Sequence, residues 1–240
     1  LVYATSYLGK VNYSANIAQI ADFSGVTKAE AGLAPTLFFF AYGIGQVVNG
    51  LLCKKYNVKW MVFTGLFTSA CINLTIALTT NFAIIKWLWM CNGFCLSILW
   101  PTLIRMLSES LPTAQLGKSS LVMGTTVGTG TLVIYGLSAI YAAFNQFKLA
   151  FFTAAFAGMT VSVVWLLFFE RYAAASKQEM DQSEAIGSAS QVKSGFKTAS
   201  SGIAVLLPAG VLCFAAVGAN LIKDGLTTWG PSILNEEGSL

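Results

Sequence analysis

Long stretches without a charged side chain follow one another along most of the chain. They cover residues 31–53, 60–85, 87–104, 119–147, 149–169 and 198–222, and residues 1–21 form another that only Lys10 interrupts. A helix that crosses a bilayer needs about 20 consecutive apolar residues. The pattern therefore predicts seven transmembrane helices.

Short polar or turn-forming segments separate these helices. We expect helices over 1–21, 32–53, 60–79, 83–107, 119–143 and 149–169. Residues 170–201 are rich in Ala, Ser, Lys, Glu and Gln, which is typical of a polar linker, partly helical or disordered. A seventh helix is expected from Gly202 past Lys223 toward Leu234, with Pro208 and Pro231 kinking or ending parts of it.

The pattern predicts an all-α membrane protein in three parts. These are a six-helix transmembrane bundle over 1–169, a linker over 170–201, and the start of a second bundle over 202–240. Composition agrees, because 55% of the residues are hydrophobic and only 10% are charged, whereas soluble domains carry about 25% charged residues. The sequence starts at Leu1 rather than Met, and we interpret it as a fragment.

The basic residues set the orientation. If the first helix runs from inside to outside, the loops on the inner side contain most of the lysines and arginines, which favours this orientation by the positive-inside rule. These inner residues are Lys54, Lys55, Lys59, Arg105, Lys118, Arg171, Lys177, Lys193 and Lys197. We therefore expect a multi-pass protein of the cell membrane with the linker 170–201 in the cytoplasm.

Six helices, a long inner linker and a new helix are the layout of one half-bundle joined to the start of a second. Secondary transporters with two such halves hold their substrate midway between them. Seven spans also suit a receptor or a rhodopsin, and Lys223 would then be the retinal lysine of the seventh helix. The long linker 170–201 and the glycine-rich second and fifth helices fit a rhodopsin poorly.

Lys10 lies near the middle of the first predicted helix, some 14 Å from its start at about 1.5 Å per residue. A lysine at mid-bilayer costs about 2.5–3.5 kcal/mol on insertion scales and usually serves a substrate, an ion or a partner. Tyr3, Tyr7 and Ser14 share its helix face. The alternatives are a snorkelling or structurally paired Lys10, and a Tyr3 that belongs to an interfacial aromatic belt.

Lys223 repeats this pattern in the seventh helix. Asn220 and Thr227 fall on its face, and the adjacent Asp224 is expected to point about 100° away. Two lysines from two halves would suit a dianion such as phosphate, to which lysine offers a point charge. The alternative places Lys223 near the outer mouth.

The sequence offers no catalytic apparatus. It has no His, no phosphate-binding glycine loop and no nucleophile elbow, and its five cysteines lack metal-ligand spacing. We therefore expect no enzyme, no cofactor and no bound metal. Gly43, Gly45 and Gly50 in the second helix indicate close helix packing, as do Gly124, Gly128 and Gly130 in the fifth.

Four segments resemble motifs of the organophosphate:phosphate antiporter family of the major facilitator superfamily, which includes glycerol-3-phosphate and hexose-phosphate transporters. They are Tyr7-Leu8-Gly9-Lys10-Val11-Asn12-Tyr13-Ser14, Ala41-Tyr42-Gly43-Ile44-Gly45-Gln46 followed by Gly50, Trp100-Pro101 with Arg105, and Lys223-Asp224-Gly225-Leu226-Thr227-Thr228-Trp229-Gly230-Pro231. They occur in the family's order over nearly the whole chain.

The resemblance implies a substrate clamp. Two arginines of the family bind the substrate phosphate, and Lys10 and Lys223 stand in their places. Tyr3, Tyr7, Gln46 and Trp100 would line the cavity, with Gln46 where a lysine is often found. Thr125 falls near the place of a site histidine, and Lys54 stands where the family has the acid of an inner gate.

These observations together predict a secondary active transporter that works by alternating access. Its expected substrate is a small anionic, phosphorylated metabolite exchanged for inorganic phosphate. Alternatives are a proton-coupled carboxylate symporter, with Asp224 as the proton carrier, and a non-transporting membrane sensor of a phosphorylated ligand. The expected partners are the small anion and the lipid bilayer, without nucleic acid, and the complete protein is expected to be monomeric.

Overall fold

The computed structural model describes residues 1–52, 55–111, 113–187, 222–226 and 228–230. The chain divides into two compact units, Leu1–Ser183 and Glu184–Leu240. The expected helix over 202–234 falls largely outside the described residues.

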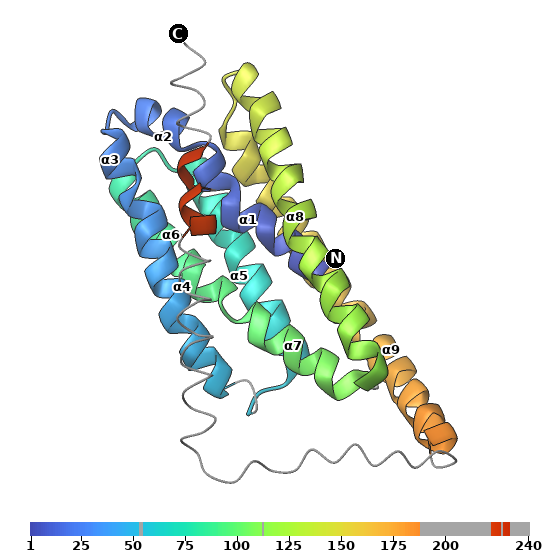
Figure 1. The fold of residues 1–240 in the computed structure, drawn as a ribbon. Coiled ribbons are helices and arrows are strands. Elements are labelled where there is room, and N and C mark those ends of the chain that lie inside the picture. The colour runs from blue at the N-terminus through green and yellow to red at the C-terminus, as the bar shows by residue number, and fades with distance from the viewer. Residues whose placement is uncertain (53–54, 112, 188–221, 227, 231–240) are drawn as a thin grey trace. The chain divides into compact units, whose positions relative to one another are not determined.

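The first unit is a bundle of long helices without a strand among the described residues (Figure 1). The helices are α1 (Val2–Ala15), α2 (Ile17–Ser24), α3 (Lys28–Ala31), α4 (Leu33–Leu52), α5 (Val58–Leu78), α6 (Phe82–Leu96), α7 (Leu99–Ser110), α8 (Thr113–Ala143) and α9 (Lys148–Gly187). In five places the described helices are long and apolar enough to cross a membrane, as the sequence predicts. The expected first span lies on α1 and α2, which are too short to count separately.

The first expected helix is broken at Asn16. The backbone there leaves the helical region, at φ −122° and ψ 19°, and the Asn16 amide N–H donates to the Tyr13 carbonyl. The Asn12 carbonyl instead accepts a hydrogen bond from the Asn16 side-chain amide at 2.7 Å. A side chain inserted into the backbone ladder is one of the recognised causes of a helix kink.

The fourth expected helix is also in two pieces, α6 and α7, which meet at Ser97 and Ile98. Pro101 explains this break, because it lacks the N–H that would bond to the Ser97 carbonyl. The Ser97 hydroxyl donates to the Phe94 carbonyl at 2.6 Å. Around the break, the backbone bond from Thr102 to the Ile98 carbonyl is stretched to 3.4 Å.

Close packing joins α4 to α6, α1 to α8 and α5 to α6. Trp89, Tyr13 and Phe38 are among the largest fully buried side chains, and their rings form a cluster with centroids about 5 Å apart. Gly93 makes the α4–α6 contact possible, because a Cβ atom there would overlap the Phe38 backbone carbonyl. The aromatic core and the glycine contact therefore hold α4 and α6 together beside α1.

Only some of the glycines expected at helix contacts are found there. Gly45 packs against Ser97 and Phe94, and a Cβ atom at Gly130 would lie 2.8 Å from that of Tyr7. A Cβ atom at Gly43, Gly50, Gly124 or Gly128 would meet nothing within 4 Å. The prediction of a packed Gly124–Gly128 face is therefore wrong within the described part, because α8 turns the Gly130 face toward α1.

The last helix of the first unit, α9, continues beyond the expected end of the sixth span at residue 169 and runs to Gly187. Near its exit from the apolar region, Lys59 and Glu170 form an ion pair at 2.7 Å. The Trp165 indole N–H donates to the Lys59 carbonyl at 3.0 Å. These bonds attach α9 to the first turn of α5.

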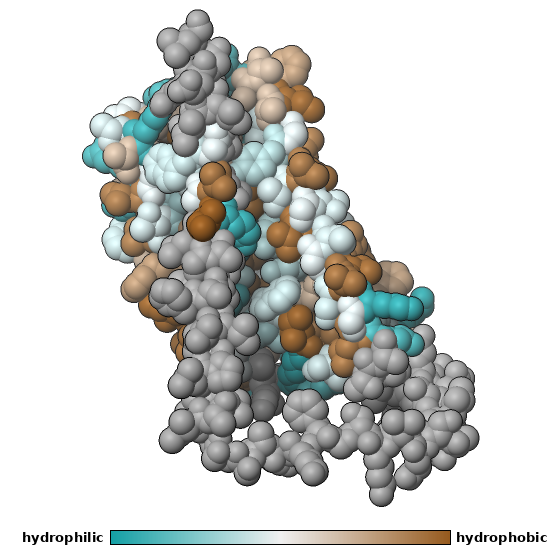
Figure 2. Space-filling model, viewed as in Figure 1, coloured by the Kyte–Doolittle hydropathy of each residue, from teal (hydrophilic) through white to brown (hydrophobic). Residues whose placement is uncertain are grey.

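Large apolar side chains are exposed along the bundle. On α8 they include Leu121, Val122, Leu132, Val133 and Ile140. Figure 2 shows hydrophobic side chains along this edge, with much of the hydrophilic surface near the two ends. Such a surface is typical of a protein whose solvent is lipid.

Candidate functional site

The Lys10 side chain lies among aromatic rings in the middle of the bundle. It is half-buried and extends from α1 toward α4, where its ammonium nitrogen lies 4.1 Å from the ring centroid of Tyr42. The Tyr7 and Phe39 centroids lie 5.3 and 5.9 Å from the same nitrogen. A cation within about 6 Å of a ring face is stabilised by about 0.5–2 kcal/mol.

Two further predicted site residues belong to the same cluster. Tyr3 packs edge-on against Tyr7, with ring centroids 5.4 Å apart, and its ring is tilted against that of Trp100, with centroids 5.2 Å apart. The structure thus brings Lys10, Tyr3, Tyr7 and Trp100 together from α1 and α7, which supports the expectation of a shared helix face.

Tyr42 and Phe39 were not among the predicted site residues. The signal for Tyr42 was present, because it lies one helical turn before Gln46 and therefore on the same face of α4. Gln46 is half-buried at this position. The sequence alone could not show that Tyr42 and Phe39 contact Lys10, since only the fold places α4 opposite this lysine.

Acidic residues are scarce around this site. Up to residue 169 the sequence contains only Asp22, Glu30 and Glu109. Glu30 accepts two hydrogen bonds in the capping box of Thr27, and Glu109 pairs with Arg105 at 2.8 Å. All three lie at helix ends, so the charge balance of the bundle interior is positive at Lys10.

Other predicted site residues lie elsewhere. Thr125 is exposed on α8 and donates its hydroxyl to the Val122 carbonyl at 2.8 Å. Ser14, expected on the Lys10 face, is buried in the core. Asn220 lies outside the described residues.

Lys223 is described as part of the second unit, where it is exposed. Asp224 was expected to point away from it, but the two charged groups lie 3.3 Å apart. The long, flexible lysine stem explains the difference, since it can fold back toward a neighbouring side chain. Exposed pairs of this kind contribute about 0–1 kcal/mol.

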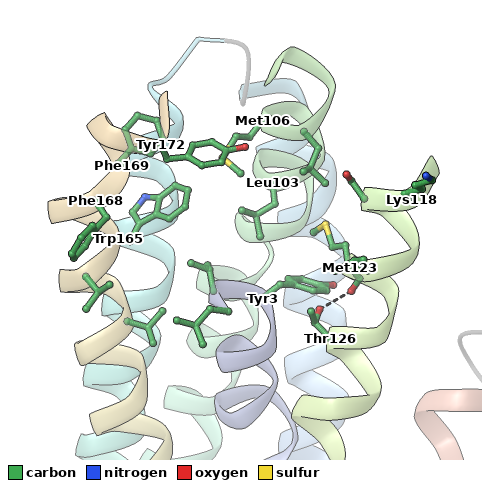
Figure 3. Close-up of a pocket in the computed structure, with 17 residues that line it drawn as sticks. Tyr3, Leu103, Met106, Lys118, Met123, Thr126, Trp165, Phe168, Phe169 and Tyr172 are labelled. Atoms are coloured by element: carbon green, nitrogen blue, oxygen red, sulfur yellow. Dashed lines mark hydrogen bonds between the residues drawn. The ribbon is translucent and has the colours of Figure 1, made fainter. Parts of the chain in front are cut away.

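A largely apolar cavity of about 580 Å³ lies between α1, α7, α8 and α9 (Figure 3). Tyr3 and Thr126 lie on its wall, Trp165 and Tyr172 face it from α9, and Lys118 is near its rim. Tyr3 therefore belongs both to the wall of this cavity and to the aromatic cluster around Lys10. Neither Lys10 nor Thr125 lines it.

The inner gate of the resembled family cannot be traced through Lys54, which lies outside the described residues. Arg105 donates from its guanidinium to the Tyr56 carbonyl at 3.2 Å and to Glu109 at 2.8 Å. The bond to Tyr56 connects α7 to the loop before α5, whereas the bond to Glu109 lies within α7.

Comparison with known proteins places these features in a family context. The family model of the Major Facilitator Superfamily matches residues 1–239. The glycerol-3-phosphate transporter of Bacillus subtilis is 24% identical over 170 residues, which cover 69% of this chain and 38% of that protein. The probable hexose phosphate transport protein of Chlamydia pneumoniae is 25% identical over 115 residues, or 48% of this chain and 25% of that protein.

A relative that is named as a sensor and not as a transporter is also similar. The membrane sensor protein UhpC of Escherichia coli is 27% identical over 94 residues, which cover 39% of this chain and 21% of that protein. In each of these three comparisons the chain spans less than two fifths of the relative's length. These are likenesses of part of each relative.

Proposed function

Because the chain belongs to the Major Facilitator Superfamily, we propose that the protein is a secondary active transporter of a small phosphorylated anion. The observation that carries this proposal is the ammonium of Lys10, held among Tyr7, Phe39 and Tyr42 in the interior of a bundle with few acids. A fixed cation in such a setting attracts an anion strongly, because low dielectric strengthens their interaction.

The phenols define which anion fits. The rings of Tyr7 and Tyr42 contact the cation, Tyr3 packs on Tyr7, and all three phenols carry a hydroxyl donor. Gln46 follows Tyr42 by one turn. Phosphate oxygens accept several such bonds at once. Relatives named for glycerol phosphate and hexose phosphate transport support a phosphorylated organic substrate.

We further propose exchange against inorganic phosphate by alternating access. In this fold class, two helical halves rock around a site near the bilayer midplane. Lys10 supplies the cation of the first half, and Lys223 is the corresponding residue in the second. Phosphate alone and the phosphorylated substrate share the group that the two lysines bind.

The test uses the full-length protein in phosphate-loaded proteoliposomes, with uptake of labelled phosphate as the readout. We expect Lys10→Gln and Lys223→Gln to abolish exchange, because a neutral amide cannot balance a dianion. Lys10→Arg should retain it. Lys86→Gln is the matched control, since Lys86 is also half-buried and also lies over a ring, that of Trp87 at 5.7 Å, but belongs to the outer end of α6. Failure of wild-type protein to exchange phosphate would refute the antiporter.

Similarity to a membrane sensor protein favours a second candidate, a protein that binds a phosphorylated ligand without moving it. The same experiment separates the two. A sensor would bind phosphate in detergent and lose binding in Lys10→Gln, yet show no exchange in proteoliposomes.

A proton-coupled carboxylate symporter is the third candidate, and it depends on Asp224. The Lys223 ammonium lies 3.3 Å from this carboxylate. A symporter would show substrate-driven proton uptake that Asp224→Asn removes, whereas an antiporter would keep phosphate exchange in that variant.

A further inference from the structure

A buried chain of amide and hydroxyl groups joins α1 to α5 and α6. The Ser69 hydroxyl donates to the Asn92 side-chain oxygen at 2.6 Å, and the Asn92 amide donates to the Gly9 carbonyl at 2.8 Å. The Asn12 amide donates to the Asn73 side-chain oxygen at 2.8 Å. Three helices are thus connected by side-chain hydrogen bonds in the apolar interior.

The network closes on itself. The Asn73 amide donates to the Ser69 carbonyl at 2.9 Å, so the two branches meet on one turn of α5. Asn12, Asn73 and Asn92 are completely buried. Breaking one bond would leave a buried polar group unsatisfied, at a cost of about 1–3 kcal/mol. The network therefore favours a single arrangement of these helices.

The network binds α1 on both sides of Lys10. Gly9 precedes the lysine directly and Asn12 follows it by two residues, while the lysine side chain extends to the Tyr42 ring of α4. Gly9 allows this grip, because a Cβ atom there would lie 3.0 Å from the Asn73 amide nitrogen and 3.3 Å from the Ser69 hydroxyl. The backbone that carries Lys10 is therefore fixed from α5 and α6.

We propose that Asn92 and Asn73 are positioning residues that set the location of the Lys10 ammonium through the α1 backbone. This inference rests on the proposed function, in which Lys10 binds the substrate phosphate. Neither asparagine touches the substrate. Loss of either bond lets the Lys10 turn shift toward α4, which changes the distance between the cation and the phenols.

This role predicts a specific kinetic signature. A misplaced binding group weakens the complex with phosphate, and small displacements have large effects. In Asn92→Leu, which keeps much of the side-chain volume, we expect the half-saturating phosphate concentration for exchange to rise about tenfold. The maximal rate should stay within about twofold of wild type, because the helices that move are intact. Asn73→Ala should show the same split.

The control is Asn49→Ala. Asn49 is also a buried amide that bonds a serine outside its own helix, Ser97 at the break between α6 and α7, at 2.9 Å. This bond does not reach the Lys10 turn. The half-saturating concentration of this variant should remain that of wild type. An equal rise in Asn49→Ala would overturn the proposal, since the effect would then report general loosening of the bundle.

Direct binding keeps the proposal testable if a variant transports poorly. The melting temperature of the full-length protein in detergent is measured against inorganic phosphate concentration, because a ligand of the native state raises it. We expect Asn92→Leu, or Asn92→Ala if the first variant does not fold, to need about tenfold more phosphate for the same rise. An unchanged phosphate dependence in a folded variant would refute the positioning role. Absence of exchange in wild type would refute the transporter instead.

Discussion

Among its aromatic neighbours, the Lys10 ammonium lies closest to the ring of Tyr42. A phenol such as this one can make two kinds of contact, one through its ring face and one through its hydroxyl. Its π face stabilises the cation, and its hydroxyl can donate to a bound anion. The site therefore contains one charged group, the Lys10 ammonium, and several aromatic rings and hydroxyls that can interact with it or with a bound anion. Phenylalanine at position 42 removes the hydroxyl alone, whereas leucine removes both the ring and the hydroxyl.

Replacing Tyr42 tests the ring. We expect Tyr42→Leu to raise the half-saturating phosphate concentration about twofold to thirtyfold, because the contact of about 0.5–2 kcal/mol that orients Lys10 is lost. Tyr42→Phe keeps the face and should have a smaller effect. Labelled phosphate uptake in proteoliposomes measures both, and equal effects of the two variants would show that the hydroxyl matters and the ring face does not.

Gly93 tests the contact between α4 and α6. We expect Gly93→Ala to lower the melting temperature of the purified protein, because its Cβ atom would overlap the Phe38 carbonyl and overpacking costs about 1–3 kcal/mol. Gly136→Ala is the control, since a Cβ atom there meets nothing within 4 Å. That variant should be neutral or stabilising by up to about 1 kcal/mol. A Gly93→Ala protein as stable as wild type would contradict the packing.

Two of the expected helices are broken, and only one of the two breaks could be predicted from the sequence. Pro101 announces the break between α6 and α7, because its missing N–H must leave one carbonyl without its helical partner. Asn16 does not predict the break within the first expected helix, since asparagine is common in turns and helix caps as well as in helices. Only its contact with Ser138 of α8, at 3.0 Å, shows why its side chain is held at the kink.

The same difference applies to the site. Periodicity along one helix was sufficient to group Lys10, Tyr3 and Tyr7, and motif order added Trp100. The partners from α4 needed the packing of α4 beside α1, which no local pattern encodes. Thr125 was placed by motif alignment without a physical constraint, and it lies on an exposed face of α8.

Restoring the missing donor should repair the break at Ser97. In Pro101→Ala the new amide N–H can bond to the Ser97 carbonyl. If the added bond contributes about 1 kcal/mol, amide hydrogen exchange across residues 98–102 should slow by about fivefold. Mass spectrometry of the detergent-solubilised protein measures this, with the α5 segment as internal reference. Unchanged exchange would show that packing, and not the proline, holds the break open.

Over the whole bundle, the basic side chains near the helix ends fall into two groups, one at each end of the bundle. Lys59, Arg105, Lys118 and Arg171 occur near one end of the helices, and Lys28, Lys86 and Lys148 near the other. The first end contains the ion pair of Lys59 with Glu170 and the bond from Arg105 to Tyr56. Our proposed orientation places this end in the cytoplasm.

Cysteine labelling tests the orientation. In a cysteine-free background, Gln146→Cys in the exposed turn between α8 and α9 should react with a membrane-impermeant maleimide on intact cells. Ala174→Cys, exposed on α9 beyond Arg171, should react only after the membrane is opened. The reverse pattern would show that the cytoplasmic side is the end with Lys28 and Lys148.

The close contact at Gly9 limits which positions around Lys10 can change to give a different substrate preference. On the α5 and α6 side of Lys10, the helix backbone rests directly on amide groups and leaves no room for even a methyl group without displacement. On the α4 side, the neighbours of the lysine are side chains, which can be exchanged without moving a backbone. Changes of substrate preference, whether by mutation over generations or by design, are therefore expected to accumulate at positions 39, 42 and 46, while position 9 stays a glycine.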